Sequence, residues 1–223
     1  MTSLGQAHMT DVMLFLKEFA RTRRDTGAIA PSSPLLARAL TRYVIPSPGR
    51  PRAVLEVGPG TGAVTRHIQP ALGPLDTLEL IEPNPRFADL LRHSYRDDSR
   101  IGLLPGLVQD HELGSYDTIV CGLPFANFEA PVVEDILGQL LGSLNPGGTL
   151  SFFAYAGIPP LRRALTSGET RERTLGTQAV LERTLRRHRF RTETVLLNVP
   201  PAHVHHLALV APAPEPALAA YSA

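Results

Sequence analysis

A carboxylate and three glycines stand together in the segment LEVGPGTGAVT, residues 55–65. The glycines follow the spacing G-x-G-x-G, and Glu56 precedes them within a short apolar run. Because glycine has no Cβ atom, such a loop can turn tightly, expose backbone to a ligand and lead into a helix N-terminus with unpaired N–H groups. A carboxylate here is a poor neighbour for a pyrophosphate and a good one for an ammonium or sulfonium group. We therefore expect S-adenosylmethionine rather than a dinucleotide at Glu56, Gly58, Pro59, Gly60, Thr61 and Gly62.

A second carboxylate supports the same ligand. Glu82 ends the apolar run LDTLELI, residues 75–81. A carboxylate at the end of the second strand can accept hydrogen bonds from both ribose hydroxyls of an adenosine. The alternative is an ordinary strand–helix turn followed by an exposed acid. The agreement of strand, glycine spacing and second acid favours the binding site.

Strand-like and helix-like patterns alternate along the chain from residue 53 onwards. This alternation predicts an α/β fold with a doubly wound, mostly parallel, seven-stranded sheet. The last two strands are joined by a short PPA link, which is too short for a parallel crossover, so one antiparallel strand should lie near the sheet edge. The expected strands are 53–57, 75–81, 101–106, one within 116–125, 149–156, 190–199 and 203–211, and the expected helices are 63–72, 86–95, 131–144 and 160–187.

Composition excludes several other classes of protein. The 223 residues carry a formal net charge of +1, so bulk charge implies no nucleic-acid partner. One cysteine allows no disulfide framework, and no spacing of cysteine and histidine suggests a metal site. The neighbouring His203, His205 and His206 should not converge on a metal, because successive strand residues point to opposite faces. We find no signal peptide and no apolar run of membrane-spanning length, and expect a cytoplasmic protein.

The N-terminal region has a distinct pattern. Residues 11–24, DVMLFLKEFARTRR, form a short basic amphipathic pattern at helical spacing. Such a helix could lie on an anionic membrane surface or dock as a lid over the catalytic domain, and both remain open. We expect this helix and lid in residues 1–45, a catalytic domain in residues 46–211 and a disordered Pro/Ala-rich tail in residues 212–223.

Residues 53–156 resemble the Rossmann-like S-adenosylmethionine-dependent methyltransferases. Across more of the chain, six segments resemble in order the motifs of bacterial phospholipid N-methyltransferases, which are related to rRNA adenine dimethylases. The resemblance implies methylation of phosphatidylethanolamine, stepwise towards phosphatidylcholine, on the inner face of the cell membrane. The segments are TGAIAPSSPLLARAL, LEVGPGTGAVT, IEPNPRF, VCGLPFANF, LNPGGTLSFFAY and NVPPAHV.

The resemblance also implies further cofactor contacts, with two departures from the family pattern. Leu107 stands where the family has an aspartate that faces the adenine amine, so Asp110 or backbone and apolar contacts would have to hold the adenine. Cys121 replaces a serine in the wall beside the methyl donor. The contacts implied in this way are Ser32, Ser33, Pro83, Leu107, Val108, Cys121 and Gly122.

The acceptor side is expected at the ends of the fourth and fifth strands. Methyl transfer from a sulfonium needs an aligned neutral amine, and no strong base is obligatory. Backbone carbonyls near Leu123, the ring of Phe125 and the hydroxyl of Tyr155 are candidates, although core packing would also explain both aromatic rings. A phospholipid also needs an anion site, for which Arg162, Arg163, Asn198 and His203 are candidates.

Three other functions remain open beside phospholipid methylation. A methyltransferase for a soluble small-molecule amine is compatible with the departures at Leu107 and Cys121. An rRNA adenine dimethylase is disfavoured by the near-neutral charge, by the lack of a basic C-terminal domain and by Gly122, where that family has asparagine. A non-catalytic cofactor-binding or lipid-binding module is disfavoured by the intact glycine loop with its two acids.

Overall fold

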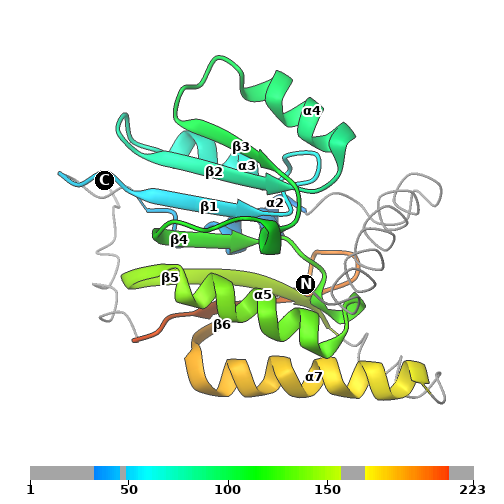
Figure 1. Cartoon of the computed structure of the whole chain (residues 1–223). Helices are drawn as coiled ribbons and strands as arrows, with labels where there is room; N and C mark the ends of the chain where they lie inside the picture. The colour runs from blue at the N-terminus through cyan, green and yellow to red at the C-terminus, as the bar shows by residue number, and fades with distance from the viewer. Residues whose placement is uncertain (1–32, 46–48, 157–168, 211–223) are drawn as a thin grey trace.

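The computed structural model describes residues 33–45, 49–156 and 169–210. Its centre is a seven-stranded sheet with the strand order β3-β2-β1-β4-β5-β7-β6 (Figure 1). Every neighbouring pair is parallel except the two pairs that include β7. The predicted mostly parallel sheet with one antiparallel strand near the edge is therefore confirmed.

The elements follow one another in nearly strict strand–helix order. The strands are β1 Ala53–Val57, β2 Thr77–Glu82, β3 Ile101–Pro105, β4 Tyr116–Cys121, β5 Leu144–Tyr155, β6 Arg189–Val195 and β7 Ala202–Leu207. The α-helices are α2 Pro34–Leu40, α3 Thr65–Ile68, α4 Pro85–Tyr95, α5 Ala130–Gly142 and α7 Glu169–His188, and the 3₁₀ turns are η1 Gln69–Ala71, η2 Val108–Asp110 and η3 Phe125–Asn127.

Helices cover both faces of the sheet and divide the core in two. On one face, α2, α3 and α4 pack against alternate strand residues such as Val54 and Leu80. On the other face, α5 and α7 pack against the intervening residues, such as Leu55 and Ile81 (Figure 1). Because strand side chains alternate between faces, a strand buried on both sides reads as a continuous apolar run, which is why β1 was predictable.

Local chemistry sets where the helices begin. The side chain of Asn84 accepts a hydrogen bond from the backbone N–H of Arg86 at 3.0 Å, and Pro85 occupies the first position of α4. In α2, Ser33 caps the helix by accepting from the N–H of Leu36 at 3.2 Å, ahead of Pro34. Both starts use a side-chain cap followed by proline, which needs no hydrogen-bond partner there.

Several element boundaries differ from the sequence-based expectation; β7, for example, ends at Leu207 rather than at residue 211. The helix expected over 63–72 is only the four residues of α3 followed by η1, since Pro70 has no N–H to continue the ladder. The NPGG segment, expected to end α5, instead belongs to β5, which starts at Leu144. The strand expected over 190–199 ends at Val195, and the apolar residues after it leave the sheet.

In the described part of the chain, no helix combines the length and the apolar character that crossing a bilayer requires.

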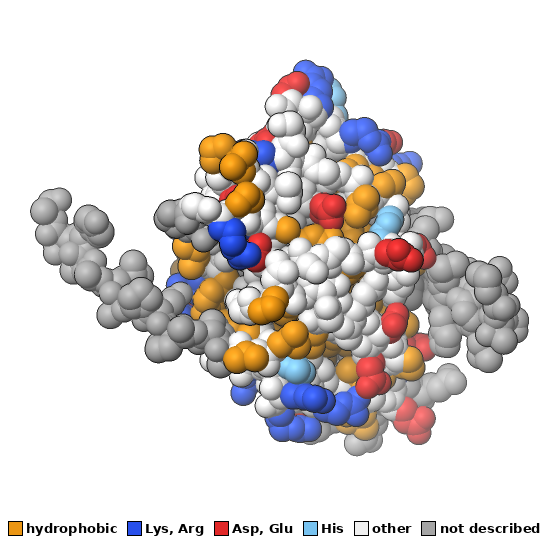
Figure 2. All heavy atoms as spheres, turned by 60° about the vertical axis from the view of Figure 1, so that its left-hand side comes forward, with side chains coloured by type: hydrophobic (Ala, Val, Ile, Leu, Met, Phe, Trp, Pro, Cys, Tyr) orange, Lys and Arg blue, Asp and Glu red, His pale blue; other side chains and the backbone are white. Residues whose placement is uncertain are grey.

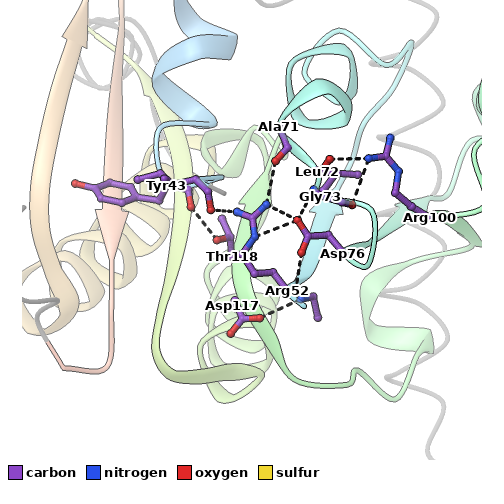
Figure 3. A network of polar contacts seen from close by, with 11 residues as sticks. Tyr43, Arg52, Ala71, Leu72, Gly73, Asp76, Arg100, Asp117 and Thr118 are labelled. Atoms are coloured by element: carbon purple, nitrogen blue, oxygen red, sulfur yellow. Dashed lines mark hydrogen bonds and ion pairs between the residues drawn. The ribbon is translucent and has the colours of Figure 1, made fainter. Parts of the chain in front are cut away.

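A buried ion pair links the residues that precede β1 and β2, at the edge of the sheet where the parallel strands begin (Figure 3). The Arg52 and Asp76 side chains form this pair, and both are almost fully buried. The backbone N–H of Arg52 also donates to Asp76 at 2.8 Å, and the guanidinium donates to the carbonyl of Ala71 at 3.0 Å. Although burial opposes ionisation of Asp76, the hydrogen bonds from Arg52 and Gly73 lower its pKa below the ordinary value. Removing one partner would leave the other charge buried alone.

The surface at this edge is mixed in character. Figure 2 brings forward the side at which the parallel strands begin, and hydrophobic side chains lie on it in small separate groups. Basic side chains gather at the bottom of the same view, the side on which α7 lies in Figure 1. Leu75, which precedes β2, and Leu209 and Val210, which follow the reversed β7, are exposed at this edge. Leu75 is a single exposed apolar residue, which is ordinary on protein surfaces, and Leu209 and Val210 form an adjacent pair.

The substitution Arg52→Met should lower the free energy of unfolding by about 3–5 kcal/mol, because it leaves the Asp76 carboxylate buried without a counter-charge. Chemical denaturation measures this change. Arg96→Ala is the control, since Arg96 and Asp97 are both exposed and their pair should contribute less than about 1 kcal/mol. Equal effects of the two substitutions would contradict a structural role for the buried pair.

Candidate active site

The glycine loop lies at the carboxyl end of β1, between β2 and β4. Gly58 has a φ of +71°, and a Cβ atom on it would lie 2.9 Å from Cδ2 of Leu123. A Cβ atom on Gly122 would lie 2.8 Å from the carbonyl oxygen of Gly58. The backbones of the two loops therefore approach closely, and only glycine permits that approach. Of the other loop residues, Pro59, Gly60 and Gly62 are buried and Thr61 is exposed.

The carboxylate of Glu82 holds this loop in place. One of its oxygens accepts a hydrogen bond from the backbone N–H of Gly60 at 2.9 Å, and the other accepts from the N–H of Asn84 at 2.8 Å. Glu82 is the last residue of β2 and is buried. The sequence places Glu82 correctly at a strand end but gives no sign that it would also fasten the neighbouring loop.

The N–H groups of the glycines have partners within the protein, contrary to the expectation of unpaired groups at a helix start. The N–H of Gly58 donates to the carbonyl of Ile81 at 2.9 Å, and that of Gly62 donates to Pro59 at 3.0 Å. With Gly60 bound to Glu82, all three donors point into the protein. A pyrophosphate site requires free donors, so this pairing and the adjacent carboxylates favour a positively charged ligand.

Glu56 is buried on the same face as Glu82. It pairs in register with Leu80, so Glu82 lies two residues further along the neighbouring strand, and side chains two apart share a face. The hydroxyl of Thr65 donates to the Glu56 carboxylate at 2.7 Å. Burial, and secondarily the charge of Glu82, raise the pKa of Glu56 to about 8. A cation beside Glu56 would favour its ionised form, and the sequence reasoning did not identify Thr65 as its partner.

An apolar pocket opens on the opposite face of the same edge. The walls include Pro83, Leu107 and Val108, which were expected at the cofactor, and Leu123, which was expected on the acceptor side. Gln109, Phe128 and Ile136 also line the pocket and were not expected. One carboxylate oxygen of Asp110, the residue that could replace the family's adenine-facing aspartate, accepts a hydrogen bond from the N–H of Leu107 at 3.1 Å and so caps η2. Gln109 is the polar side chain that lines the pocket. The walls are mostly apolar, but the space between them is only about 10 Å³, so an adenine ring can enter only when the walls move apart.

Taken together, the two sides of this edge fit S-adenosylmethionine. The carboxylate face matches its positive charges, the loop brings backbone close to a ligand, and the apolar lining of the pocket has the character that an adenine ring requires. The positions that would hold it are Glu56 and Glu82 on one face and the walls around Leu107 and Val108 on the other.

Cys121 lies beneath this site. Its side chain is fully buried, and it pairs in register with Val57 and Phe152. Burial raises the pKa of the thiol to about 12. The thiol is therefore neutral at physiological pH, and the geometry gives it the packing role of a wall residue.

The three acceptor candidates have different surroundings. Leu123 is buried, lines the pocket and has its carbonyl bonded to the N–H of Phe125 at 3.0 Å. Phe125 is buried in the core, where its ring meets Phe152 edge-on at 5.3 Å between centroids. This packing explains the buried position of Phe125 without any contact to the methyl acceptor. Tyr155 ends β5, is partly exposed and packs against Phe153 on the face that carries Glu56 and Glu82.

The structure describes two of the four residues that were expected to bind an anion, Asn198 and His203. Arg162 and Arg163, like Ser32, lie outside the described residues. The Asn198 side chain is buried and acts within the protein: its oxygen accepts from the N–H of Ser33 at 3.3 Å, and its nitrogen donates to the carbonyl of Pro200 at 2.6 Å. His203 contacts the Thr194 hydroxyl at 3.0 Å. The Asn198 side chain therefore orders the turn between β6 and β7.

A hydrogen-bonded network of a serine, a histidine and a carboxylate spans β5, β7 and β6 and is buried inside the protein. Nδ1 of His206 lies 2.8 Å from the Ser151 hydroxyl, and Nε2 lies 3.0 Å from the Glu193 carboxylate. Both His206 and Ser151 are fully buried, and burial lowers the pKa of His206 to about 4. The chain therefore serves as a core network. No group of three or more His, Cys, Asp or Glu within the described ranges is placed to hold a metal ion.

Comparisons with known proteins show which family the chain resembles. A family described as "Methyltransferase domain" matches residues 55–150. An ornithine lipid N-methyltransferase from Singulisphaera acidiphila is 31% identical over 150 residues, which cover 64% of this chain and 77% of that protein.

Solved structures share the fold at low identity. An O-methyltransferase from Bacillus cereus, crystallised with SAH, the demethylated form of the cofactor, has a TM-score of 0.61 at 15% identity and covers 87% of this chain and 90% of its own. The N-methyltransferase NodS from Bradyrhizobium japonicum has a TM-score of 0.57 at 18% identity and covers 79% of this chain and 96% of its own. The Rossmann-like methyltransferase fold expected from the sequence is confirmed.

The affinity for SAH should rise as pH rises towards about 8, because the ammonium group of SAH beside Glu56 favours the ionised carboxylate and binding therefore releases a proton. Calorimetry in two buffers of different ionisation enthalpy measures that release. The stability of the ligand-free protein should change with pH in the opposite direction. Because Glu56 keeps its proton up to about pH 8 in the folded state but ionises at lower pH in the unfolded state, the free energy of unfolding should fall as pH rises towards 8. Glu56→Gln should remove both trends and weaken SAH binding by at least about tenfold. Unchanged affinity and an unchanged pH profile would exclude Glu56 from the site.

The contact between the two loops can be tested with Gly122→Ala, which places a Cβ atom 2.8 Å from the backbone oxygen of Gly58. Because neither backbone can yield without moving the loop, SAH affinity should fall by at least about tenfold. Gly138→Ala on α5 is the control, since nothing lies within 4 Å of its added Cβ atom. It should leave binding unchanged and add up to about 1 kcal/mol of stability.

Proposed function

Since the chain belongs to the S-adenosylmethionine-dependent methyltransferases, we propose that it transfers methyl groups to the primary amine of a membrane lipid, with phosphatidylethanolamine as the first candidate. Methylation proceeds stepwise towards phosphatidylcholine at the membrane surface. The observation that carries the lipid class is the 31% identity to a protein named ornithine lipid N-methyltransferase. That relative also makes an ornithine lipid the second candidate, because both lipids present an amine at a bilayer surface.

The cofactor site supports the transfer through charge and exclusion of water. When bound, S-adenosylmethionine supplies a methyl group on a positively charged sulfur. Glu56 and Glu82 would balance the positive charges at the loop, and the walls at Leu107 and Leu123 would exclude water from the adenine. The loop itself is held by its hydrogen bond to Glu82, so it need not be ordered again when ligand binds.

The acceptor would be aligned at the ends of β4 and β5. A lipid amine must arrive neutral, because a protonated ammonium has no lone pair to attack with. Tyr155, partly exposed at the end of β5, is the side chain we assign to accept a hydrogen bond from that amine. The proton leaves to water after transfer, and no strong base is required. Cys121 takes no part, because its thiol stays neutral and buried.

The lipid assignment is tested with vesicles that contain either phosphatidylethanolamine or an ornithine lipid, with radiolabelled methyl donor. We expect labelled lipid, mono- to trimethylated, identified by mass spectrometry. Soluble amines such as ethanolamine should be inactive. Labelling of soluble amines with none of either lipid would overturn the proposal, and labelling of the ornithine lipid alone would replace the first candidate by the second.

Tyr155→Phe should lower kcat by about tenfold while leaving SAH affinity unchanged, because it removes one hydrogen bond to the acceptor and keeps the ring packed on Phe153. Tyr43→Phe is the matched control, since Tyr43 packs against Phe190 and His206. An undiminished kcat for Tyr155→Phe would remove this residue from the acceptor site.

A further inference from the structure

The turn between β6 and β7 carries a set of exposed apolar side chains. Its sequence is LLNVPP, residues 196–201, without a charged residue. Leu196, Leu197 and Val199 are 73%, 79% and 78% exposed. We propose that this turn inserts into the interfacial region of a lipid bilayer and docks the catalytic edge on the membrane. The inference rests on the proposed lipid substrate and adds to it the surface and orientation of docking.

The turn lies at the edge of the sheet where the site opens. The end of β5 and the start of β7 are paired, with Tyr155 opposite Ala202. The N–H of Ala156 donates to the carbonyl of Pro201 at 2.7 Å. In Figure 1 the orange trace of this turn lies on the side to which the parallel strands point, the side of the glycine loop. The apolar tip and the assigned acceptor tyrosine are therefore neighbours.

The structure holds the apolar side chains outwards. Asn198, in the middle of the turn, is the buried member, and its amide binds Pro200 within the turn and Ser33 at the start of α2. With Asn198 anchored inwards, the leucines before it and the valine after it remain exposed. Leu35, in the first turn of α2, is also 42% exposed beside this anchor. A fixed turn that exposes leucine and valine costs little ordering entropy when it inserts.

Three features favour a bilayer as the occupant of this surface. A lipid amine sits in the headgroup layer, so an enzyme that methylates it must bring its acceptor edge to that layer. An uncharged tip with large aliphatic side chains suits the boundary between headgroups and acyl chains. Among the described residues, the other large apolar side chains that are more than half exposed are Leu75, Leu209 and Val210. They lie at the opposite edge, where docking would turn the site away from the lipid.

The chain contains no tryptophan, so one introduced tryptophan reports its own surroundings. We would compare Leu197→Trp with Leu75→Trp, whose native side chains are 79% and 74% exposed. The vesicles contain phosphatidylethanolamine and phosphatidylglycerol, with and without brominated acyl chains. With vesicles present, the fluorescence emission of the tryptophan in Leu197→Trp should shift to shorter wavelength and be quenched by the brominated lipid. The emission of the tryptophan in Leu75→Trp should change in neither way. No shift at Leu197→Trp, or equal shifts at both positions, would overturn the proposal.

A second pair of variants separates docking from catalysis. Leu196→Ser with Leu197→Ser should weaken vesicle binding and vesicle methylation by about tenfold or more. It should leave activity on monomeric, short-chain phosphatidylethanolamine unchanged. Leu209→Ser with Val210→Ser is the matched control at the opposite edge and should change neither.

Other results have distinct meanings. If the native protein methylates vesicle lipid and the turn variant binds vesicles normally, the docking inference is wrong while the proposed function stands. If the native protein methylates no lipid amine in either form, the proposed function fails, whatever the fluorescence shows. Self-association that disappears in the turn variant, with vesicle binding unchanged, would assign this surface to a second copy of the chain and overturn the inference.

Discussion

Two buried carboxylates beside one short loop impose the main electrostatic constraint on this protein. Glu56 and Glu82 point to the same face of the sheet. The Thr65 hydroxyl donates to Glu56, and the N–H groups of Gly60 and Asn84 donate to Glu82. Burial near another carboxylate disfavours the charged form of Glu56 and raises its pKa to about 8. A bound cation relieves that cost. The site is thus poised for a positively charged ligand at the expense of stability in its absence, a common relation between active sites and folds.

The parallel sheet makes this constraint possible. Because β1, β2 and β4 run in one direction, their carboxyl ends meet at one edge, where the loops after each strand share a small volume. Alternation along the strands then separates the two halves of the site: the carboxylates face α3, and the apolar pocket faces α5. A single ligand with a charged part and a flat apolar part can bridge the edge. The buried pair of Arg52 and Asp76 fastens the opposite edge, away from any ligand.

The reversed strand has a consequence for the acceptor side. β6 runs parallel to the central strands, so it ends at the catalytic edge, and β7 must begin there. The turn between them is therefore placed beside the end of β5 and Tyr155. This turn carries the exposed side chains of Leu196, Leu197 and Val199. For a lipid substrate, the same turn can set the angle and depth at which the acceptor edge meets the bilayer.

The sequence by itself determined the elements whose signals are local. The apolar run of β1, the glycine spacing after it and the acid at the end of β2 each depend on neighbours within a few residues. Only the tertiary structure decided which groups meet across the sheet: Thr65 with Glu56, Glu82 with the N–H of Gly60, and Gln109 with the pocket. It also ended β6 at Val195, although the apolar pattern runs on to Val199, because pairing with β7 rather than hydrophobicity determines where the strand stops. Long-range pairing and burial fix these contacts, and a one-dimensional pattern carries neither.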